Sequence, residues 1–250
     1  MLEILRKKFE TYEKTCPINN LQDGCVTFIR DKKYIHYLRK NKDVWVIAPK
    51  ELKNEFGMYQ ESYSPDIKGI FIDYPEYYFC LYHNMLYGDR PKIEPKIGKN
   101  CKIHETVVMD VDGLKIVNGP NGEKIQFIHS GWVEIGDDVE IGPYTVIHRG
   151  TMGETKISNN CKIGAKNNIG HNCFIGPNTV FAVGSILNGG VWMGKNCWVS
   201  SGVMIKHYTK ITNDVVLGMG TMVLKDITES GVYVGNPARF LKPVKEGWNF

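Results

Sequence analysis

An apolar residue returns at every sixth position of this sequence between Ile157 and Val223. The twelve positions are Ile157, Ile163, Ile169, Ile175, Phe181, Leu187, Met193, Val199, Ile205, Ile211, Leu217 and Val223. In a chain that is 42% hydrophobic, twelve such positions in a row would be a roughly one-in-ten-thousand event or rarer by chance. The hexad is therefore an internal repeat.

The repeat predicts a mainly β fold, a parallel β-helix with three short strands in each turn. Glycine often follows the apolar position, as at Gly164, Gly176 and Gly194, and a small or β-branched residue such as Thr179 or Ser185 comes four positions after it. Small residues suit tight corners, and apolar residues at a fixed period suit a narrow core. We expect a triangular prism whose turns stack at about 4.8 Å.

Eighteen residues make one turn of this prism, so residues eighteen apart lie above one another. His171 and His207 each follow an apolar position of the same column by two residues, which places them two turns apart, about 10 Å along one edge. Gly189, followed by Gly190, lies between them. This register requires that four residues inserted after Ile147 loop out of the helix.

The residues of this edge are candidates for acid–base catalysis. A histidine titrates near neutral pH and can accept a proton, and the backbone N–H of Gly189 is a candidate oxyanion donor. His148 and Arg149 lie beneath His171 in the same register. The alternative is that corner positions of a β-helix are simply polar and exposed, and spacing alone does not decide between the two.

The chain divides into two expected domains. Residues 1–92 carry three short apolar runs, at 25–29, 44–48 and 69–74, and the segments between and after them have helix-like composition; alternation of this kind predicts a small α/β domain. Residues 93–250 form the β-helix, with the linker at 87–95. A Gly- and Asn-rich loop at 110–132 interrupts the hexad, and loops that leave a regular solenoid are usually functional.

Two aromatic residues of the first domain flank a strand–helix turn. Phe28 closes a predicted strand and Tyr34 opens the next helix. Aromatic faces in such a place can sandwich a flat base. Packing in the domain core is the other interpretation of the same two residues.

Composition excludes several classes of function. The net charge is +4, and basic residues alternate with acidic ones, so we expect no nucleic-acid partner. No apolar run is long enough to span a bilayer, and the first residues, MLEILRKKFE, do not resemble a signal peptide. The seven cysteines include no CxxC pair, so we expect buried thiols in a cytoplasmic protein and no metal site.

These motifs together resemble a known family. The repeat is similar to the hexapeptide acyltransferases, whose β-helices are left-handed and assemble as trimers. The stretch GWVEIGDDVEIGPYTVIHRGTMGETKISNNCKIGAKNNIGHNCFIG resembles the UDP-3-O-acylglucosamine N-acyltransferases in particular, as does VVLGMGTMVLKDITESGVYVGNP. PINNLQDGCVTFIRDKKYIHYL resembles the uridine-binding domain of the same family.

The resemblance implies roles for the residues of the predicted edge. His171 matches the catalytic base, and Gly189 matches the oxyanion glycine. His207 lies within one residue of the position where the family has a second histidine, which meets the thioester cofactor. We count His207 and Gly190 as candidate cofactor contacts.

The resemblance also assigns substrate contacts outside the edge. Phe28 and Tyr34 match the two aromatic residues that hold the uracil, and the loop DVDGLKI resembles one that reaches over the sugar. Two positions depart from the family: Asp31 stands where asparagine is usual beside the uracil, and His148, next to Arg149, stands where aspartate is usual. We count all five residues as candidate substrate contacts.

The acyl donor follows from the C-terminal sequence. The family's helical extension, which helps to engage acyl carrier protein, has no counterpart here, and GNPARFLKP resembles the ending of acetyl-CoA-dependent members. Arg239 is a candidate phosphate contact or, equally, a solvated arginine of the tail. The resemblance thus implies an acyl-CoA donor, preferably acetyl-CoA.

The sequence predicts a homotrimeric N-acyltransferase that acts on a nucleotide-linked amino sugar in bacterial surface-polysaccharide synthesis. The closest alternative is an acyl-ACP-dependent UDP-3-O-acylglucosamine N-acyltransferase of lipid A synthesis. A non-catalytic nucleotide-sugar-binding scaffold is the alternative of another class. A zinc carbonic anhydrase with this fold would require two histidines close in sequence, a spacing that the seven histidines of this chain do not show.

Overall fold

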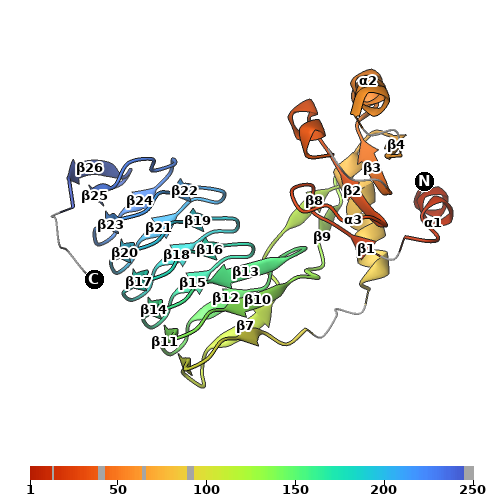
Figure 1. The fold of residues 1–250 in the computed structure, drawn as a ribbon. Helices are drawn as coiled ribbons and strands as arrows, with labels where there is room; N and C mark the ends of the chain where they lie inside the picture. The colour runs from red at the N-terminus through yellow and green to blue at the C-terminus, as the bar shows by residue number, and fades with distance from the viewer. Residues whose placement is uncertain (13, 39–42, 64–65, 89–92, 245–250) are drawn as a thin grey trace. The chain divides into compact units, whose positions relative to one another are not determined.

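The structure is a computed structural model that describes residues 1–12, 14–38, 43–63, 66–88 and 93–244. Its contacts divide the chain into two compact units. The first unit comprises Met1–Pro91 and Leu114–Ile128, and the second comprises Lys92–Gly113 and His129–Phe250. Figure 1 labels the helices and strands of both units.

The first unit is built on a parallel sheet of four strands in the order β1-β2-β3-β4. Its strands are β1 (Lys14–Thr15), β2 (Cys25–Phe28), β3 (Val44–Ala48) and β4 (Lys68–Phe71). Its helices are α1 (Leu2–Lys8), η1 (Lys32–Leu38), η2 (Lys50–Leu52), α2 (Lys53–Tyr63) and α3 (Pro75–Leu86). The segment after β2 is a 3₁₀ helix rather than the expected α-helix, and α1 and β1 were not anticipated. Part of the predicted linker, residues 89–92, lies outside the described residues.

The middle of the loop at 110–132 is a β-hairpin that packs in the first unit. Its strands, β8 (Ile116–Asn118) and β9 (Lys124–Gln126), pair in antiparallel fashion. The Phe127 ring stacks on His83 of α3, with ring centroids 4.2 Å apart, and the Asn84 side chain donates a hydrogen bond to the Gln126 carbonyl at 2.8 Å. The hairpin therefore has a buried side of its own.

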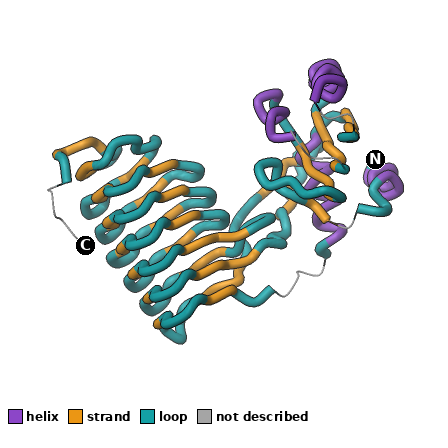
Figure 2. The backbone as a smooth tube through the Cα atoms, in the orientation of Figure 1, coloured by secondary structure: helices purple, strands orange, loops and turns teal. Residues whose placement is uncertain are grey.

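The second unit is a parallel β-helix with three faces, and Figure 2 shows its successive coils. The first face holds β5 (Lys96–Ile97), β10 (Trp132–Ile135), β13 (Glu154–Ile157), β16 (Phe174–Ile175), β19 (Trp192–Met193) and β22 (Lys210–Ile211). The second face holds β6 (Lys102–Ile103), β11 (Glu140–Ile141), β14 (Lys162–Ile163), β17 (Val180–Phe181), β20 (Trp198–Val199), β23 (Val215–Leu217), β25 (Gly231–Val234) and β26 (Arg239–Lys242). The third face holds β7 (Val108–Val111), β12 (Val146–His148), β15 (Asn168–Ile169), β18 (Ile186–Leu187), β21 (Met204–Ile205) and β24 (Met222–Val223).

The predicted fold class and register are confirmed. On the third face Ile147 pairs with Ile169, Ile169 with Leu187, and Leu187 with Ile205. The last two pairings have the predicted spacing of eighteen, and the first is longer by the four residues that loop out before β13. All the apolar positions of the hexad point into one continuous core.

Corner residues in the left-handed region close each turn. Asn160, Asn178 and Asn196 all have φ between +56° and +59°, a conformation that asparagine tolerates better than most residues. Their side chains form a ladder along one edge, with Asn160 donating to Asn178 at 3.0 Å and Asn178 donating to Asn196 at 3.1 Å. The corner residues therefore tie neighbouring turns together as well as reversing the chain.

Three cysteines of the repeat lie in the core, as predicted. Cys161, Cys173 and Cys197 are fully or almost fully buried, and burial raises the pKa of Cys161 to about 11 and those of Cys173 and Cys197 to about 12. Cys101 is half-buried. The three buried thiols therefore pack as small apolar side chains.

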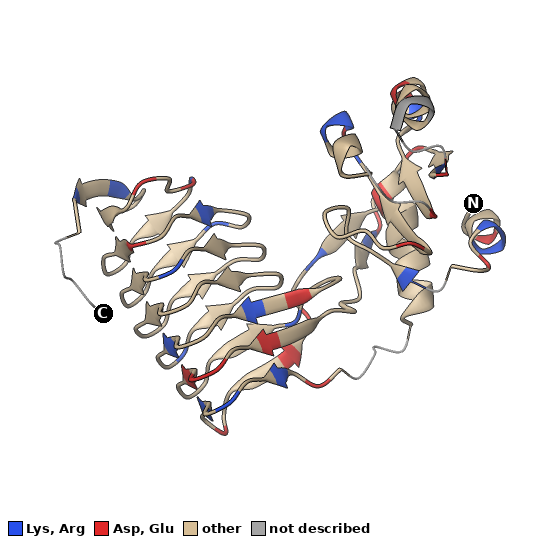
Figure 3. Ribbon diagram, in the orientation of Figure 1, with Lys and Arg blue, Asp and Glu red and all other residues tan. Residues whose placement is uncertain are grey.

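Charged side chains on the first two faces are concentrated in the early coils (Figure 3). On the first face Lys156 forms an ion pair with Glu134 at 2.5 Å. On the second face Glu140 lies between Lys102, at 3.3 Å, and Lys162, at 3.1 Å. Among the described residues no helix combines the length and the apolar character that crossing a bilayer requires.

Candidate active site

The corner between the third and first faces stacks the residues that the register predicted. Gly190 donates its N–H to the His171 carbonyl at 2.7 Å, and Tyr208 donates its N–H to the Gly189 carbonyl at 3.0 Å. These two bonds place His171, Gly189 and His207 in three successive coils. The prediction that they share one edge is confirmed, and we call this edge, as the candidate site of catalysis, the catalytic edge.

The side chain of Asn172 sets the tautomer of His171. The Asn172 Oδ1 atom accepts from the backbone N–H of Thr151 at 3.0 Å and from its hydroxyl at 2.9 Å, and it lies 3.0 Å from His171 Nδ1. An amide oxygen can only accept, so Nδ1 of His171 carries the proton and Nε2 keeps its lone pair. This is the protonation state that a general base requires.

Gly189 lets the imidazole lie against the backbone of the next coil. A Cβ built on Gly189 would lie against His171 Nε2 and 2.6 Å from Cε1, so only glycine leaves room for the ring in this position. Among the described residues, no group accepts a hydrogen bond from the Gly189 N–H. A backbone donor beside a basic nitrogen is the arrangement that stabilises a tetrahedral oxyanion.

Two residues at the ends of the inserted loop complete the surroundings of His171. His129 is 0% exposed, and its ring meets that of His171 edge-on, with centroids 5.2 Å apart at 75°. Gly113 donates its N–H to His129 Nδ1 at 3.1 Å. The hexad pattern gave no signal for either residue, although both adjoin the interruption that the sequence marked as functional.

Arg149 corrects the sequence prediction. Its side chain is 0% exposed, and Nε donates to the Gly131 carbonyl at 2.7 Å and pairs with Asp110 at 3.1 Å. A guanidinium enclosed in this way does not reach a substrate, so Arg149 holds the insertion at Asp110 against the first coils. Its neighbour His148 is half-buried, with Nδ1 3.1 Å from the Asp112 carbonyl and Nε2 3.0 Å from Asn168 Oδ1.

The candidate cofactor contacts lie further along the helix. His207 is exposed, and its ring stands perpendicular to that of Tyr208 at 5.5 Å. Gly190 has φ of +73°, and a Cβ on it would lie against the Tyr208 ring. Arg239, at the start of β26, is exposed. The Gly190 N–H is already bonded to the His171 carbonyl, and Arg239 donates to the Ala238 carbonyl at 3.0 Å from its exposed side chain.

The candidate base-binding residues belong to the first unit. Phe28 packs on Phe79 of α3 with ring centroids 4.8 Å apart, and Tyr34 is half-buried, with the Lys33 ammonium 5.2 Å from its ring centroid. Asp31 is exposed, and its carboxylate accepts from the Lys33 N–H at 3.0 Å. All three predicted residues follow the carboxyl end of β2, the usual side for ligands in parallel sheets.

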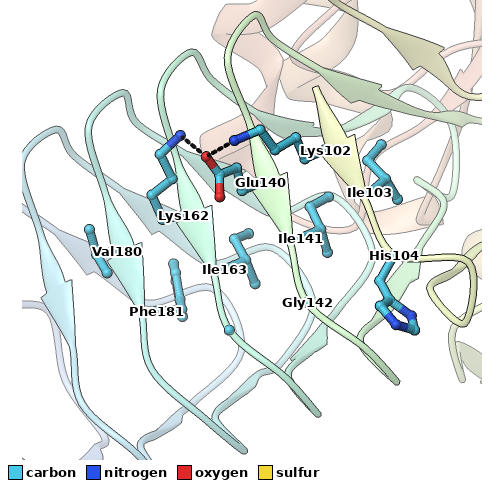
Figure 4. Close-up of a pocket in the computed structure, with 11 residues that line it drawn as sticks. Lys102, Ile103, His104, Glu140, Ile141, Gly142, Lys162, Ile163, Val180 and Phe181 are labelled. Carbon is cyan, nitrogen blue, oxygen red and sulfur yellow. Dashed lines mark hydrogen bonds and ion pairs between the residues drawn. The ribbon is translucent and has the colours of Figure 1, made fainter. Parts of the chain in front are cut away.

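A pocket lies away from the catalytic edge, on the second face (Figure 4). It encloses about 560 Å³ and follows strands β6, β11, β14 and β17. Its polar lining is mainly the Lys102, Glu140 and Lys162 cluster. His104 also lines this open groove, but it does not lie in the column that stacks His171, Gly189 and His207, so the catalytic edge remains the candidate site. No three metal-ligating side chains of the described ranges are grouped as an ion would require.

The sequence is similar to those of curated acyltransferases. A UDP-3-O-acylglucosamine N-acyltransferase from Janthinobacterium sp. (strain Marseille) is 36% identical over 140 residues, which cover 56% of this chain and 40% of the relative. The same enzyme from Hahella chejuensis is 36% identical over 143 residues, covering 57% of this chain and 40% of the relative. The match thus spans about two fifths of the length of these curated relatives. No family model matches the sequence.

Solved structures share the fold. A UDP-N-acetylglucosamine acyltransferase from Francisella novicida superposes with a TM-score of 0.50 at 25% identity, over 56% of this chain and 49% of its own. Another UDP-N-acetylglucosamine acyltransferase gives a TM-score of 0.53 at 14% identity, over 91% of this chain and 69% of its own. About half of this chain is therefore similar in sequence to UDP-3-O-acylglucosamine N-acyltransferases, and its β-helix has the left-handed fold of the hexapeptide-repeat acyltransferases.

Proposed function

We propose that this protein is an N-acyltransferase that moves an acyl group from acyl-CoA, preferably acetyl-CoA, to the amino group of a nucleotide-linked amino sugar. The observation that carries the proposal is the catalytic edge, where the Nε2 lone pair of His171 lies beside the unused N–H of Gly189. The names of the homologous enzymes support a nucleotide-sugar acceptor.

The edge supplies what the reaction needs. The sugar amine attacks the thioester carbonyl, which forms the C–N bond and a tetrahedral oxyanion, while His171 Nε2 takes the proton from the nitrogen. The Gly189 N–H stabilises the oxyanion. Collapse of this intermediate breaks the C–S bond, and the imidazolium returns its proton to the departing sulfur, which leaves as the thiol of CoA. No covalent enzyme intermediate is involved.

Other candidate residues would contact the donor and the acceptor. His207, beside Gly190, would position the pantetheine arm, and Arg239 would contact a phosphate of CoA. This donor assignment is supported by the resemblance of Gly235–Arg239 to acetyl-CoA-dependent members of the superfamily. His148 would contact the sugar, and Phe28, Asp31 and Tyr34 the base, in the reaction that we propose for the cytoplasm.

We propose a homotrimer whose contacts include the third face. The outward side chains of this face are mostly apolar, and Val108, Ile186 and Met204 are 44%, 37% and 45% exposed. Val146 and Met222 continue the stripe. Contiguous apolar surface of this kind marks an interface, and a single flat face beside His171 is too shallow to enclose two substrates. Light scattering checks the assembly, and a monomer would contradict this part of the proposal.

Thiol release from acetyl-CoA tests the function, measured across a panel of UDP-, dTDP- and GDP-linked amino sugars with His171→Ala as the control. We expect turnover with one acceptor class and its loss in the variant. No thiol release by the wild-type protein with any acceptor, together with nucleotide-sugar binding that His171→Ala leaves intact, would instead favour a nucleotide-sugar-binding scaffold, whereas full turnover in His171→Ala would remove His171 as the base. In the same assay, Phe28→Ala should lose the preference for the base; an unchanged preference would remove the stacking role.

A second candidate is favoured by the names of the homologous enzymes, UDP-3-O-acylglucosamine N-acyltransferase. In that case the acceptor is UDP-3-O-acylglucosamine and the donor is acyl-ACP. Transfer from acyl-ACP to this acceptor, with no thiol release from acetyl-CoA on any amino sugar of the panel, would replace the donor that we propose.

A further inference from the structure

We propose that His129 is a positioning residue, which together with Gly113 holds the imidazole of His171 in its catalytic orientation. The inference rests on the proposed role of His171 as the base. It assigns a catalytic purpose to both ends of the inserted loop, whose middle forms the hairpin of β8 and β9.

The His129–Gly113 pair forms a wall on one side of the His171 ring. A Cβ built on Gly113 would lie 2.8 Å from Cδ2 of His171 and 3.1 Å from Cε1 of His129, so the Gly113 backbone reaches both imidazoles. The His129 ring closes the same side edge-on at 5.2 Å. The wall therefore packs against the Cδ2 side of the His171 ring, while Asn172 faces its Nδ1.

This arrangement discriminates between the two orientations of the ring. Rotation of the His171 side chain by half a turn about χ2 would exchange Nδ1 with Cδ2. Nδ1–H would then lose the Asn172 oxygen as its acceptor, and Cδ2 would face that oxygen instead. Losing this hydrogen bond is unfavourable, so Asn172 selects the orientation that leaves Nε2 over Gly189, and the packing of the wall against the ring restrains its rotation.

The hydrogen bonds of His129 in turn depend on its protonation state. Its Nδ1 lies 3.1 Å from the Gly113 nitrogen and 3.2 Å from the Arg149 carbonyl oxygen. The backbone N–H is always a donor, so Nδ1 bonds to Gly113 only when it carries no proton. A proton on Nδ1 would make this nitrogen a donor to the Arg149 carbonyl instead, and the Gly113 N–H would lose its acceptor on His129.

The surrounding charges favour neutral His129. Arg149, whose carbonyl lies near His129 Nδ1, also carries a fully buried guanidinium. Asp110 already pairs with that guanidinium. Asp112 accepts the His129 backbone N–H through Oδ2 at 3.5 Å, and His171 faces the ring on the open side. A second buried cation beside Arg149 would be costly, so His129 is neutral, and the neutral tautomer with its proton on Nε2 keeps the Gly113 bond.

The test compares His129→Ala with His129→Asn, since the Asn side-chain oxygen can replace Nδ1 as the acceptor for Gly113. Imidazole ¹⁵N shifts, recorded on ¹⁵N-histidine-labelled protein and assigned with His171→Gln, report the tautomer of His171 without any substrate. His104→Ala is the matched control, because His104 is an exposed corner histidine of the second face.

We expect wild-type protein to show His171 protonated at Nδ1, and His129→Ala to show averaging between the two tautomers. The kcat for acyl transfer should fall about tenfold or more in His129→Ala with little change in KM, since only the geometry of the base is altered. His129→Asn should recover most of the kcat and the wild-type tautomer. A merely structural His129 would lower the unfolding midpoint without this rescue.

Unchanged ¹⁵N shifts of His171 in folded His129→Ala and His129→Asn would overturn the positioning role. Altered shifts in His129→Ala, restored in His129→Asn, would support it even if the protein transferred no acyl group to any acceptor. That second result would count against the proposed function and not against the positioning role, so the two failures are distinguishable.

Discussion

Replacement of Gly189 by alanine tests the close approach between the His171 ring and the backbone of the next coil. The new Cβ would lie 2.6 Å from His171 Cε1, whereas carbon atoms in contact lie about 3.5–4.0 Å apart, so the ring would retreat by about 1 Å. A displacement of about 1 Å at a reacting group costs about 10²-fold in rate, or about 2.7 kcal/mol of activation free energy. Because the clash is with a side chain that can swing away, the free energy of unfolding should change by less than about 0.5 kcal/mol.

The assay for Gly189→Ala is thiol release at saturating acetyl-CoA and acceptor, alongside urea unfolding. Gly57→Ala is the control, since a Cβ on Gly57 meets nothing within 4 Å and the variant should keep the wild-type kcat. We expect kcat to fall in Gly189→Ala while the unfolding midpoint stays in place. A wild-type kcat in a folded Gly189→Ala enzyme would refute the assignment of His171 and Gly189 as one catalytic pair.

Three further predictions concern the β-helix. Leu187 is 0% exposed in the core, so Leu187→Ala should lower the unfolding free energy by about 2.7–5 kcal/mol in a urea titration. Val183 lies at a corner and is 48% exposed, so Val183→Ala should cost under about 1 kcal/mol in the same titration. Equal losses in the two variants would contradict the predicted core. The hydrogen bond from Lys156 lowers the pKa of the Glu134 carboxyl below its ordinary value. The stabilising effect of this hydrogen bond is therefore present above the ordinary pKa of a glutamate and is lost as the pH falls through the lowered pKa of Glu134. Glu134→Gln should therefore lower the free energy of unfolding at pH 7 by under about 1 kcal/mol, since the pair is partly exposed, and should have less effect below pH 4. A stability difference between variant and wild type that does not change with pH would count against the ion pair. Burial raises the pKa of the Cys173 thiol to about 12, so iodoacetamide at pH 8 should modify Cys173 only after the protein unfolds. Mass spectrometry measures the modification, and rapid modification of the native protein would contradict the burial of Cys173.

The β-helix was predictable because its pattern is both periodic and local. Each apolar position meets its counterparts eighteen residues away, so one repeat length decides the register of the whole prism. The column from Ile169 through Leu187 to Ile205 follows from that number alone, and so does the stacking of His171 under Gly189. The four residues inserted before β13 could also be located, because the apolar positions on either side of the insertion keep their six-residue spacing and only the step from Ile147 to Ile157 is longer.

The surroundings of the base were not predictable in this way. His129 and Gly113 reach His171 from the ends of an insertion, where no period relates one residue to another. Arg149 illustrates the opposite error, since its place beneath His171 in the register suggested a substrate contact. Its burial depends on Asp110 and the Gly131 carbonyl, neither of which the register places beside it.

The sequence by itself determined the coil, its register and the order of His171, Gly189 and His207 along one edge, because a six-residue period of apolar side chains has only one regular way to bury them. Only the tertiary structure decided how the His171 ring is oriented and which residues surround it. Those features depend on contacts between an irregular insertion and the regular coils, and hydrogen bonds such as that from Gly113 to His129 are set by three-dimensional distance and not by spacing along the chain.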